Sequence, residues 1–286
     1  MSWFVLSLGA AVTQAGQFAV LKGRAQAIPP LVIVAWNQSV AVSGWLVFFA
    51  ISGRPLGTPG RAWPAVLVGA LLVIGMNLLL ARASTRGDIS IVGPVFALSP
   101  VFTVLPDALL SGTLPRALGW LGLALSVAGT VSLSGGGVRQ LRALFARRDA
   151  LDALGAAVLL GMVAAVDRWG AMVMGPPSYL VFSHGVIALS TGALALVTMP
   201  AAMAASLRPR NLVTLISHGL LGGAGTGMQT TALTAAPAAY VNAIRRMSAL
   251  IAVILGAALF REPDLRRRLT AAALACAGAA CLLLAH

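Results

Sequence analysis

Long apolar runs alternate with short polar stretches along the whole chain. Each run has about the 20 residues that a helix needs to cross the hydrocarbon core of a bilayer. The separators are rich in Pro and Gly, as in Pro29-Pro30, Pro176-Pro177 and residues 53–60, which is typical of turns. The pattern predicts ten transmembrane helices, at Ser2–Leu21, Leu31–Ile51, Trp63–Ala81, Ile89–Ser111, Ala117–Ser134, Leu151–Val173, Ser178–Met199, Leu212–Leu233, Ala236–Phe260 and Leu269–Leu284.

The composition favours an all-α integral membrane protein. The 286 residues are 59% hydrophobic and 9% charged, whereas soluble domains carry roughly 25% charged residues. The net charge of +13 arises from basic residues that lie mainly in the loops, and membrane topology explains that placement. We therefore expect the lipid bilayer, and no nucleic acid, as a partner of a multi-pass protein of the plasma (inner) membrane.

The loop charges predict an orientation. An even number of spans places both ends of the chain on one side of the membrane, which we call the terminal side; the other is the opposite side. Most basic loop residues fall on the opposite side, and only Arg54, Arg61 and Arg116 fall on the terminal side. The positive-inside rule then makes the opposite side cytoplasmic and leaves both ends of the chain outside.

The chain divides into two similar blocks. A basic loop at 135–150 separates residues 1–134 from residues 151–286, and each block holds five predicted helices. Gly75-Met76-Asn77 in the third helix recurs as Gly227-Met228-Gln229 in the eighth. Five is an odd number, so a tandem duplicate enters the membrane the other way up. This predicts two inverted five-helix repeats around a central cavity, although helices rich in small residues also resemble one another without duplication.

Residues 238–262, AAYVNAIRRMSALIAVILGAALFRE, lead to Ala277-Gly278 in the last helix. This stretch resembles the EamA-type members of the drug/metabolite transporter (DMT) superfamily, and it is the stronger of two matches. The first block matches with residues 92–105, VGPVFALSPVFTVL, and Ala128-Gly129. The first block departs from the pattern at Leu114, where the second has the acidic Glu262. The resemblance implies ten helices around a cavity and transport of small metabolites or drugs, usually outward.

Charged residues inside the predicted spans are the strongest candidates for function, because a charge at the bilayer centre costs about 2.5–3.5 kcal/mol on insertion scales. We expect Asp167 to pair with Arg245 or Arg246, or with a substrate. Adjacent arginines project about 100° apart on a helix, so the second one is free to bind a carboxylate or phosphate. Arg168 is expected to extend toward the terminal side, and Asp107 to be solvated.

Uncharged polar residues add to these candidates. In the second block they gather toward the terminal side, and in the first block toward the opposite side, as an inverted repeat requires. The candidates for substrate binding are Tyr240, Asn242, His184, Gln229, Asn77, Gln17 and Asn37. Each has a structural alternative: packing or a proton relay for His184, interhelical hydrogen bonds for Asn77 and Gln229, and interfacial anchoring for Tyr240.

Proline and glycine suggest where helices bend or pack closely. Pro94, Pro100 and Pro106 recur every six residues in the fourth helix, where proline removes a backbone donor and kinks the helix. They are candidate gating elements. Gly222, Gly223, Gly225 and Gly227 narrow the eighth helix and permit close approach of its neighbours.

Together these features predict a secondary transporter, more specifically an exporter of a small molecule, that works by alternating access between two inverted repeats. No G-x-x-x-x-G-K-[ST] motif for ATP is present, no cofactor or metal is expected, and coupling to protons is left open, as is the oligomeric state. A membrane-embedded enzyme acting on lipid or prenyl substrates is the alternative, but such chemistry usually needs clustered carboxylates or a His/Ser or His/Cys pair.

Overall fold

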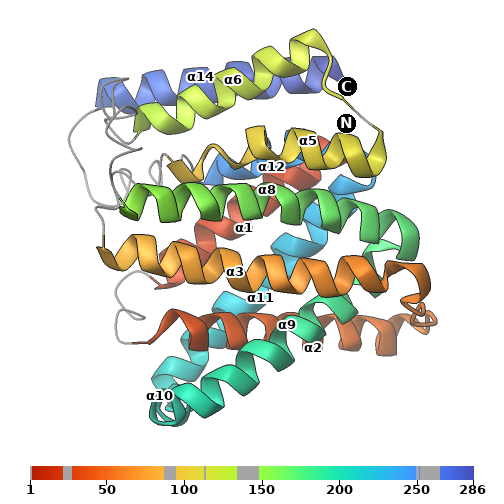
Figure 1. Cartoon of the computed structure of the whole chain (residues 1–286), viewed down its shortest axis with the longest axis vertical. Helices are drawn as coiled ribbons and strands as arrows, with labels where there is room; N and C mark the ends of the chain where they lie inside the picture. Colours follow the sequence, from red (N-terminus) through yellow and green to blue (C-terminus); the bar gives the residue numbers. More distant parts are fainter. Residues whose placement is uncertain are drawn as a thin grey trace.

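The computed structural model describes residues 2–21, 28–86, 95–112, 114–133, 148–248, 251 and 265–286. These residues form helices and connecting turns, with no β-strand among them (Figure 1). The helices are α1 (Ser2–Leu21), α2 (Pro30–Ser52), the 3₁₀ turn η1 (Gly60–Ala62), α3 (Trp63–Arg86), α5 (Ser99–Ser111), α6 (Ala117–Leu133), α8 (Arg148–Met174), α9 (Pro176–Thr198), α10 (Pro200–Ser206), α11 (Pro209–Leu233), α12 (Ala238–Arg246) and α14 (Leu265–Ala285).

Five of the helical segments are long and apolar enough to cross a membrane. These are α1, α2, the segment Gly60–Ala83, α8 and α9; Ala117–Ser132 and Thr270–Ala285 are shorter apolar helices. Large apolar side chains on the outside of the bundle remain uncovered, such as Ile51 at 82% exposure and Val197 at 81%. Such surfaces are tolerated where lipid rather than water surrounds the protein, so the helical membrane class predicted from the sequence is confirmed.

The fourth predicted helix is not continuous. Val95 and Phe96 are helical, a turn follows, and α5 begins only at Ser99. Pro100 explains the break, because it has no N–H to donate to the carbonyl of Phe96 and is accommodated only in the first turn of a new helix. Pro106 lies inside α5. Pro94 lies outside the described residues, as does most of the predicted 135–150 loop, whose last residues form the first turn of α8.

The ninth predicted helix is also interrupted. α12 ends at Arg246, and Met247 is a turn whose backbone N–H bonds to the carbonyl of Ile244. Between α9 and α11 the structure adds α10, which the sequence pattern does not predict. The Trp36 indole fixes α10 to α2 by donating to the Ser206 hydroxyl over 2.8 Å.

The most extensive helix contacts join one helix of the first half to one of the second. The pairs are α6 with α14, α3 with α8, α1 with α11, and α2 with α9. The helices of the two halves can be matched in order: α1 with α8, α2 with α9, α3 with α11, α5 with α12, and α6 with α14. When every helix is exchanged for its match, each of these contact pairs becomes another pair of the set or remains the same pair. The pairs α5 with α8 and α1 with α12 exchange in the same way. The two halves therefore contact each other along most of their helices.

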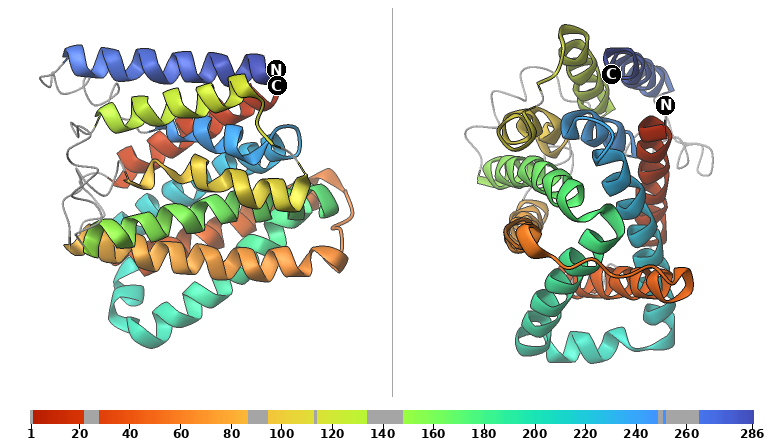
Figure 2. Two further views of the ribbon diagram at one scale, coloured as in Figure 1. Left: turned by 45° about the horizontal axis from the view of Figure 1, so that its top comes forward. Right: turned by 90° about the vertical axis from the view of Figure 1, so that its right-hand side faces the viewer.

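Glycine allows the closest of these approaches. A Cβ added at Gly129 of α6 would lie 2.8 Å from the backbone N of Ala275, and one at Gly278 of α14 would lie 2.6 Å from the backbone N of Ser126. Both predicted small-residue motifs thus place backbone directly against backbone. Figure 2 shows the resulting α6–α14 pair along one edge of the bundle.

The two ends of the chain lie side by side (Figure 1). The rings of Trp3 and His286 are 5.3 Å apart, and the His286 imidazole also bonds to the carbonyl of Ala235. α1 therefore begins on the side of the bundle where α14 ends, as expected for an even number of crossings.

Candidate substrate cavity

A cavity of about 590 Å³ lies between the two halves. It receives side chains from α1, α2 and α3 of the first half, and from α8, α9, α11 and α12 of the second. Most of the residues predicted for substrate binding line it, namely Gln17, Asn37, Asn77, Asp167, His184, Gln229, Arg245 and Arg246. The structure thus gathers polar groups from distant parts of the sequence into one chamber.

Tyr240 and Asn242 lie elsewhere. Tyr240 is 2% exposed and packs in the apolar core, with its ring 6.4 Å from that of Trp3. The Asn242 amide donates to the Thr103 hydroxyl over 3.0 Å and so joins α12 to α5. The contacts of these two residues hold α12 against its neighbours on faces other than the one that lines the cavity. The sequence indicates the depth of both residues, but depth alone does not say which way a side chain points.

The carboxylate of Asp167 bonds to a tyrosine rather than to an arginine. The Tyr179 hydroxyl donates to Asp167 Oδ1 over 2.7 Å. Within the described residues Asp167 forms no ion pair, so the expected pairing with Arg245 or Arg246 is not present in this conformation. Gly69 leaves room for the pair, because a Cβ there would lie 3.3 Å from the Tyr179 hydroxyl.

The two arginines take different partners, as their 100° separation predicts. Arg245 donates from Nε to the side-chain oxygen of Gln14 over 3.2 Å. Arg246 lies over the face of the Phe96 ring, 5.3 Å from its centroid. The break in the fourth helix and the break after α12 therefore bring Phe96 and Arg246 together at the cavity wall. The buried Nε of Arg246 has no hydrogen-bond partner in the described part of the protein.

His184 links three helices across the two halves. Its Nδ1 contacts Gln38 Oε1 on α2, and its Nε2 lies 3.1 Å from the Thr226 hydroxyl on α11. Asn77, by contrast, bonds to its own helix, donating to the carbonyl of Val73 over 2.8 Å. Among the described residues Asn77 therefore makes no interhelical bond, whereas His184 contacts side chains of two other helices.

A second polar cluster includes a histidine that is absent from the candidates chosen on the sequence. The Gln17 amide donates to Asn37 Oδ1 and to the backbone carbonyl of His218, each over 3.1 Å. His218 is 9% exposed, and its Nδ1 has no partner among the described residues. Gly222 packs against Gln17 and Asn37 with no room for a Cβ. The glycine at this position is a signal of close packing, and His218 lies one turn before it on the predicted helix. Nothing in the sequence indicates that Gln17 and Asn37 lie beside them.

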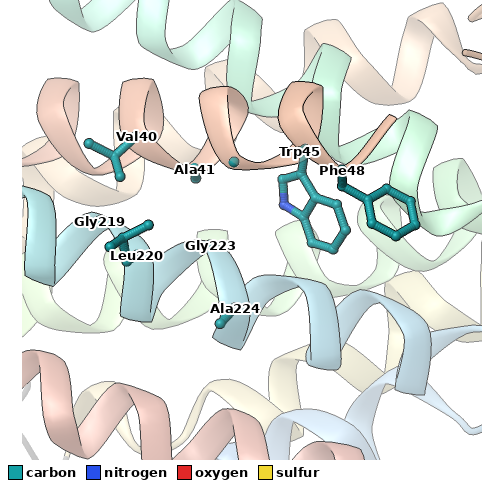
Figure 3. A pocket seen from close by; sticks show the side chains of 9 residues that line it. Val40, Ala41, Trp45, Phe48, Gly219, Leu220, Gly223 and Ala224 are labelled. Carbon is teal, nitrogen blue, oxygen red and sulfur yellow. The ribbon is translucent and has the colours of Figure 1, made fainter. Parts of the chain in front are cut away.

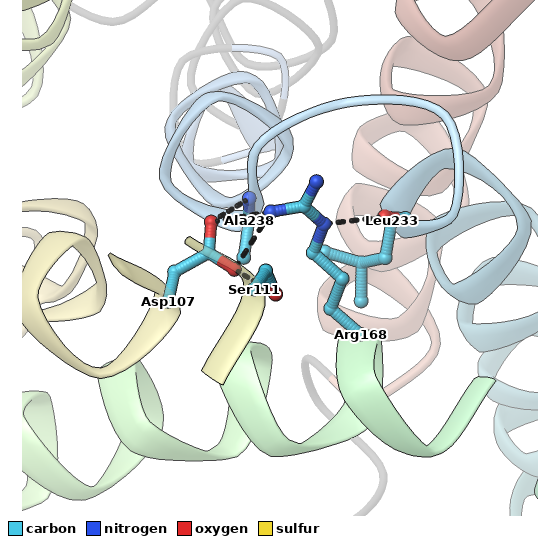
Figure 4. A network of polar contacts seen from close by, with 5 residues as sticks. All are labelled: Asp107, Ser111, Arg168, Leu233 and Ala238. Atoms are coloured by element: carbon cyan, nitrogen blue, oxygen red, sulfur yellow. Dashed lines mark hydrogen bonds and ion pairs between the residues drawn. The ribbon is translucent and has the colours of Figure 1, made fainter. Parts of the chain in front are cut away.

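A buried ion pair joins Asp107 to Arg168 (Figure 4). Arg168 Nη1 donates to both Asp107 oxygens over 2.8 and 2.9 Å, and its Nε donates to the carbonyl of Leu233 over 3.0 Å. Asp107 also accepts from the backbone N–H of Ala238, the first residue of α12, and from the Ser111 hydroxyl. The expectations of a solvated Asp107 and an extended Arg168 were wrong, since each finds its buried partner on another helix.

A smaller hollow of about 230 Å³ lies between α2 and α11 (Figure 3). Its wall is apolar, with Val40, Trp45, Phe48 and Leu220 around the glycines of α11. Gly219 and Gly223 let α2 approach closely, because a Cβ at either would press on Val40 or Ala41. The lining of this hollow offers no charged group to a polar solute.

The fold and the cavity define a multi-pass helical membrane protein with a polar chamber between two halves. Residues 1–135 match the model of the EamA-like transporter family. This match confirms, over that segment, the resemblance to EamA-type transporters seen in the sequence.

The fold as a whole also has a known counterpart. A solved structure titled "Crystal structure of protein" superposes with a TM-score of 0.81, covers 99% of each chain and is 18% identical. At this identity the likeness shows the fold alone. No curated protein matches the sequence.

Proposed function

We propose that the protein is a secondary transporter that moves a small molecule through the cavity between its halves. The observation that carries this proposal is the clustering of Asp167, Arg245 and Arg246 on one chamber within apolar helices. Charges inside a membrane are costly, and they persist where they line water or bind a solute. A volume of about 590 Å³ is within the range of small-molecule sites.

The pattern of helix contacts supports two inverted repeats. Exchange of the first five helices for the second five preserves the main contacts, and the family match covers the first half. The fourth helix is broken near Phe96, and its counterpart α12 ends beside Met247. Interrupted helices at corresponding positions of two halves are typical of substrate sites in secondary transporters.

We propose that the cavity opens toward the opposite side. There its lining includes Phe18, 49% exposed, and Pro30 at the start of α2, which is also exposed. Toward the terminal side the lining ends at Tyr179, which is fully buried. Beyond it the Asp107–Arg168 pair ties α5 to α8 and to the start of α12. We propose that alternating access requires these terminal-side contacts to open when the opposite side closes.

The direction we propose is outward, from a cytoplasmic opposite side to an external terminal side of the plasma membrane. The basic loops support this orientation through the positive-inside rule. Residues for the site are Asp167, Arg245, Arg246, His184, Gln229, Asn77, Gln17 and Asn37.

A transport assay with a mixture of candidate solutes tests the proposal. Proteoliposomes containing the full chain are incubated with labelled small metabolites, and the retained solutes are identified by mass spectrometry. We expect at least one solute to be retained by the wild type, and its retention to fall at least tenfold in D167N. L189A, at an exposed lipid-facing position of α9, serves as the control and should transport normally. Retention no greater than in empty liposomes would contradict the proposal.

A further inference from the structure

Two side chains that line the cavity carry a buried polar atom without a partner. They are Nε of Arg246 and Nδ1 of His218, and neither is satisfied by any described residue. A buried polar group left unpaired costs about 1–3 kcal/mol. Native proteins rarely keep such groups, and an ordered water, an ion, a ligand or a functional role usually accounts for each one. Both residues line the same chamber, so a ligand there lies next to two side chains whose hydrogen bonds are incomplete.

The charge balance of the cavity indicates the sign of that ligand. The charged residues in its described lining are Arg245, Arg246 and Asp167, so two positive charges face one negative charge, an excess of +1 with His184 and His218 neutral. Asp167 does not neutralise either arginine by direct contact, because its bond goes to Tyr179. An anion in the cavity would balance the excess charge.

Arg246 is oriented to receive such an anion. The Phe96 ring covers one face of the guanidinium at 5.3 Å, and a planar guanidinium held on one face presents its N–H edge to carboxylate or phosphate oxygens. Arg245 is less available, since its Nε already donates to Gln14.

His218 provides a second, uncharged point of contact. The Gln17 amide donates to its backbone carbonyl, and Gly222 on the next turn of α11 packs against Gln17 and Asn37. Neighbouring contacts therefore fix this part of α11 beside the cavity. Nδ1 bonds to no described residue, and the imidazole lines the chamber, so the ring can hydrogen-bond to a hydroxyl, amide or carbonyl group of a solute.

We propose that the transported solute is an organic anion, a carboxylate or a phosphate ester, whose charged group binds Arg246 and whose uncharged part hydrogen-bonds to His218. This inference rests on the proposed function, because it takes the cavity as the solute site. It adds the chemical class of the solute, and it names His218 as a specificity residue.

Thermal unfolding of the full chain in lipid nanodiscs tests the proposal with matched probes. The anions are phenylacetate, hexanoate and phenyl phosphate; phenylacetamide and hexanamide are the neutral counterparts, and phenethylamine is the cation. We expect at least one anion to raise the melting temperature while its neutral counterpart and the amine do not. A larger shift with phenyl phosphate than with phenylacetate assigns the site to phosphate esters, and the reverse order assigns it to carboxylates.

Variants identify the residue responsible. R246Q should weaken the apparent affinity for the anion by about 10- to 100-fold, as expected for loss of a hydrogen bond to a charged group. R246K should retain the preference for the anion over the amide. R210Q, an exposed arginine outside the cavity lining, is the matched control and should bind as the wild type does.

The proposal is overturned if no anion stabilises the protein, if amides or the amine stabilise it equally, or if R246Q binds the anion unchanged. Should R246Q not fold, the anion-over-amide difference in the wild type and in R246K decides the matter. Uptake of only neutral or cationic solutes by proteoliposomes would reject the anion and leave the transporter standing. Anion-specific stabilisation without any uptake would instead reject transport and retain the site.

Discussion

Asp107 on α5 and Arg168 on α8 form a buried ion pair, with Nη1 of the arginine 2.8 Å from Oδ1 of the carboxylate. The pair joins the two halves of the molecule, and the same carboxylate caps the first residue of α12. Neither side chain is more than 8% exposed. This arrangement leaves few lone pairs or protons of the pair unsatisfied, which is the condition under which buried charges are stable.

Removal of one member of this pair should destabilise the protein strongly. D107N and R168Q are each expected to lower the free energy of unfolding by about 3–5 kcal/mol, because each leaves a buried charge uncompensated. The double variant should be less destabilised than the sum of the two. Thermal or chemical unfolding in detergent measures this double-mutant cycle, and additive losses would show that the pair is not coupled.

The partner of Asp167 can be identified by a second cycle. D167N and Y179F should be coupled by about 1.5–3 kcal/mol, the range for a hydrogen bond to a charged group. The cycle of D167N with R245Q serves as its control and should give a smaller coupling, since those side chains form no ion pair. A larger coupling with Arg245 than with Tyr179 would restore the ion pair expected from the sequence.

Close packing of α6 on α14 predicts a third outcome. G129A and G278A place a methyl group against backbone atoms of the partner helix, so each should lower stability by about 1–3 kcal/mol or more. G192A is the matched control, because a Cβ at Gly192 meets nothing within 4 Å. Melting temperatures of the three variants test the prediction, and equal values for all of them would refute it.

The orientation of the chain is testable with reporters. Fusions at Met1 and at His286 should report the same compartment, and the loop charges predict that it is the outside of the cell. A reporter pair of alkaline phosphatase and green fluorescent protein separates the two outcomes. Fluorescence of a C-terminal fusion inside the cell would reverse the assignment of the terminal side.

The sequence predicts most of the helices and most of the cavity lining, because both depend on hydropathy and depth. Asp167, Arg245 and Gln229 are polar residues that the sequence places inside their spans toward the terminal side, and they do line the cavity. Tyr240 satisfies the same criterion, yet it points into the apolar core. Membrane helices are apolar on nearly all faces, so the sequence carries little information on which face of a helix is directed inward.

Partners that are distant in sequence account for the remaining errors. From the sequence, Arg168 is expected to extend toward the terminal side, because the neighbouring Asp167 is already assigned to the predicted site. In the structure the partner of Arg168 is Asp107, which lies on a helix of the other half. Gln17, whose amide donates to the backbone carbonyl of His218, is 201 positions away from it in sequence. Such pairings follow from helix packing, which local patterns do not specify.

The contact between Trp3 and His286 has a consequence for protein engineering. Because the amino and carboxyl ends touch, a short peptide could tether them into a closed ring, and a new opening elsewhere would then yield a circularly permuted protein. Any cargo domain fused to one end would likewise emerge beside a domain fused to the other, so the two could be used as a proximity pair without disturbing the chamber.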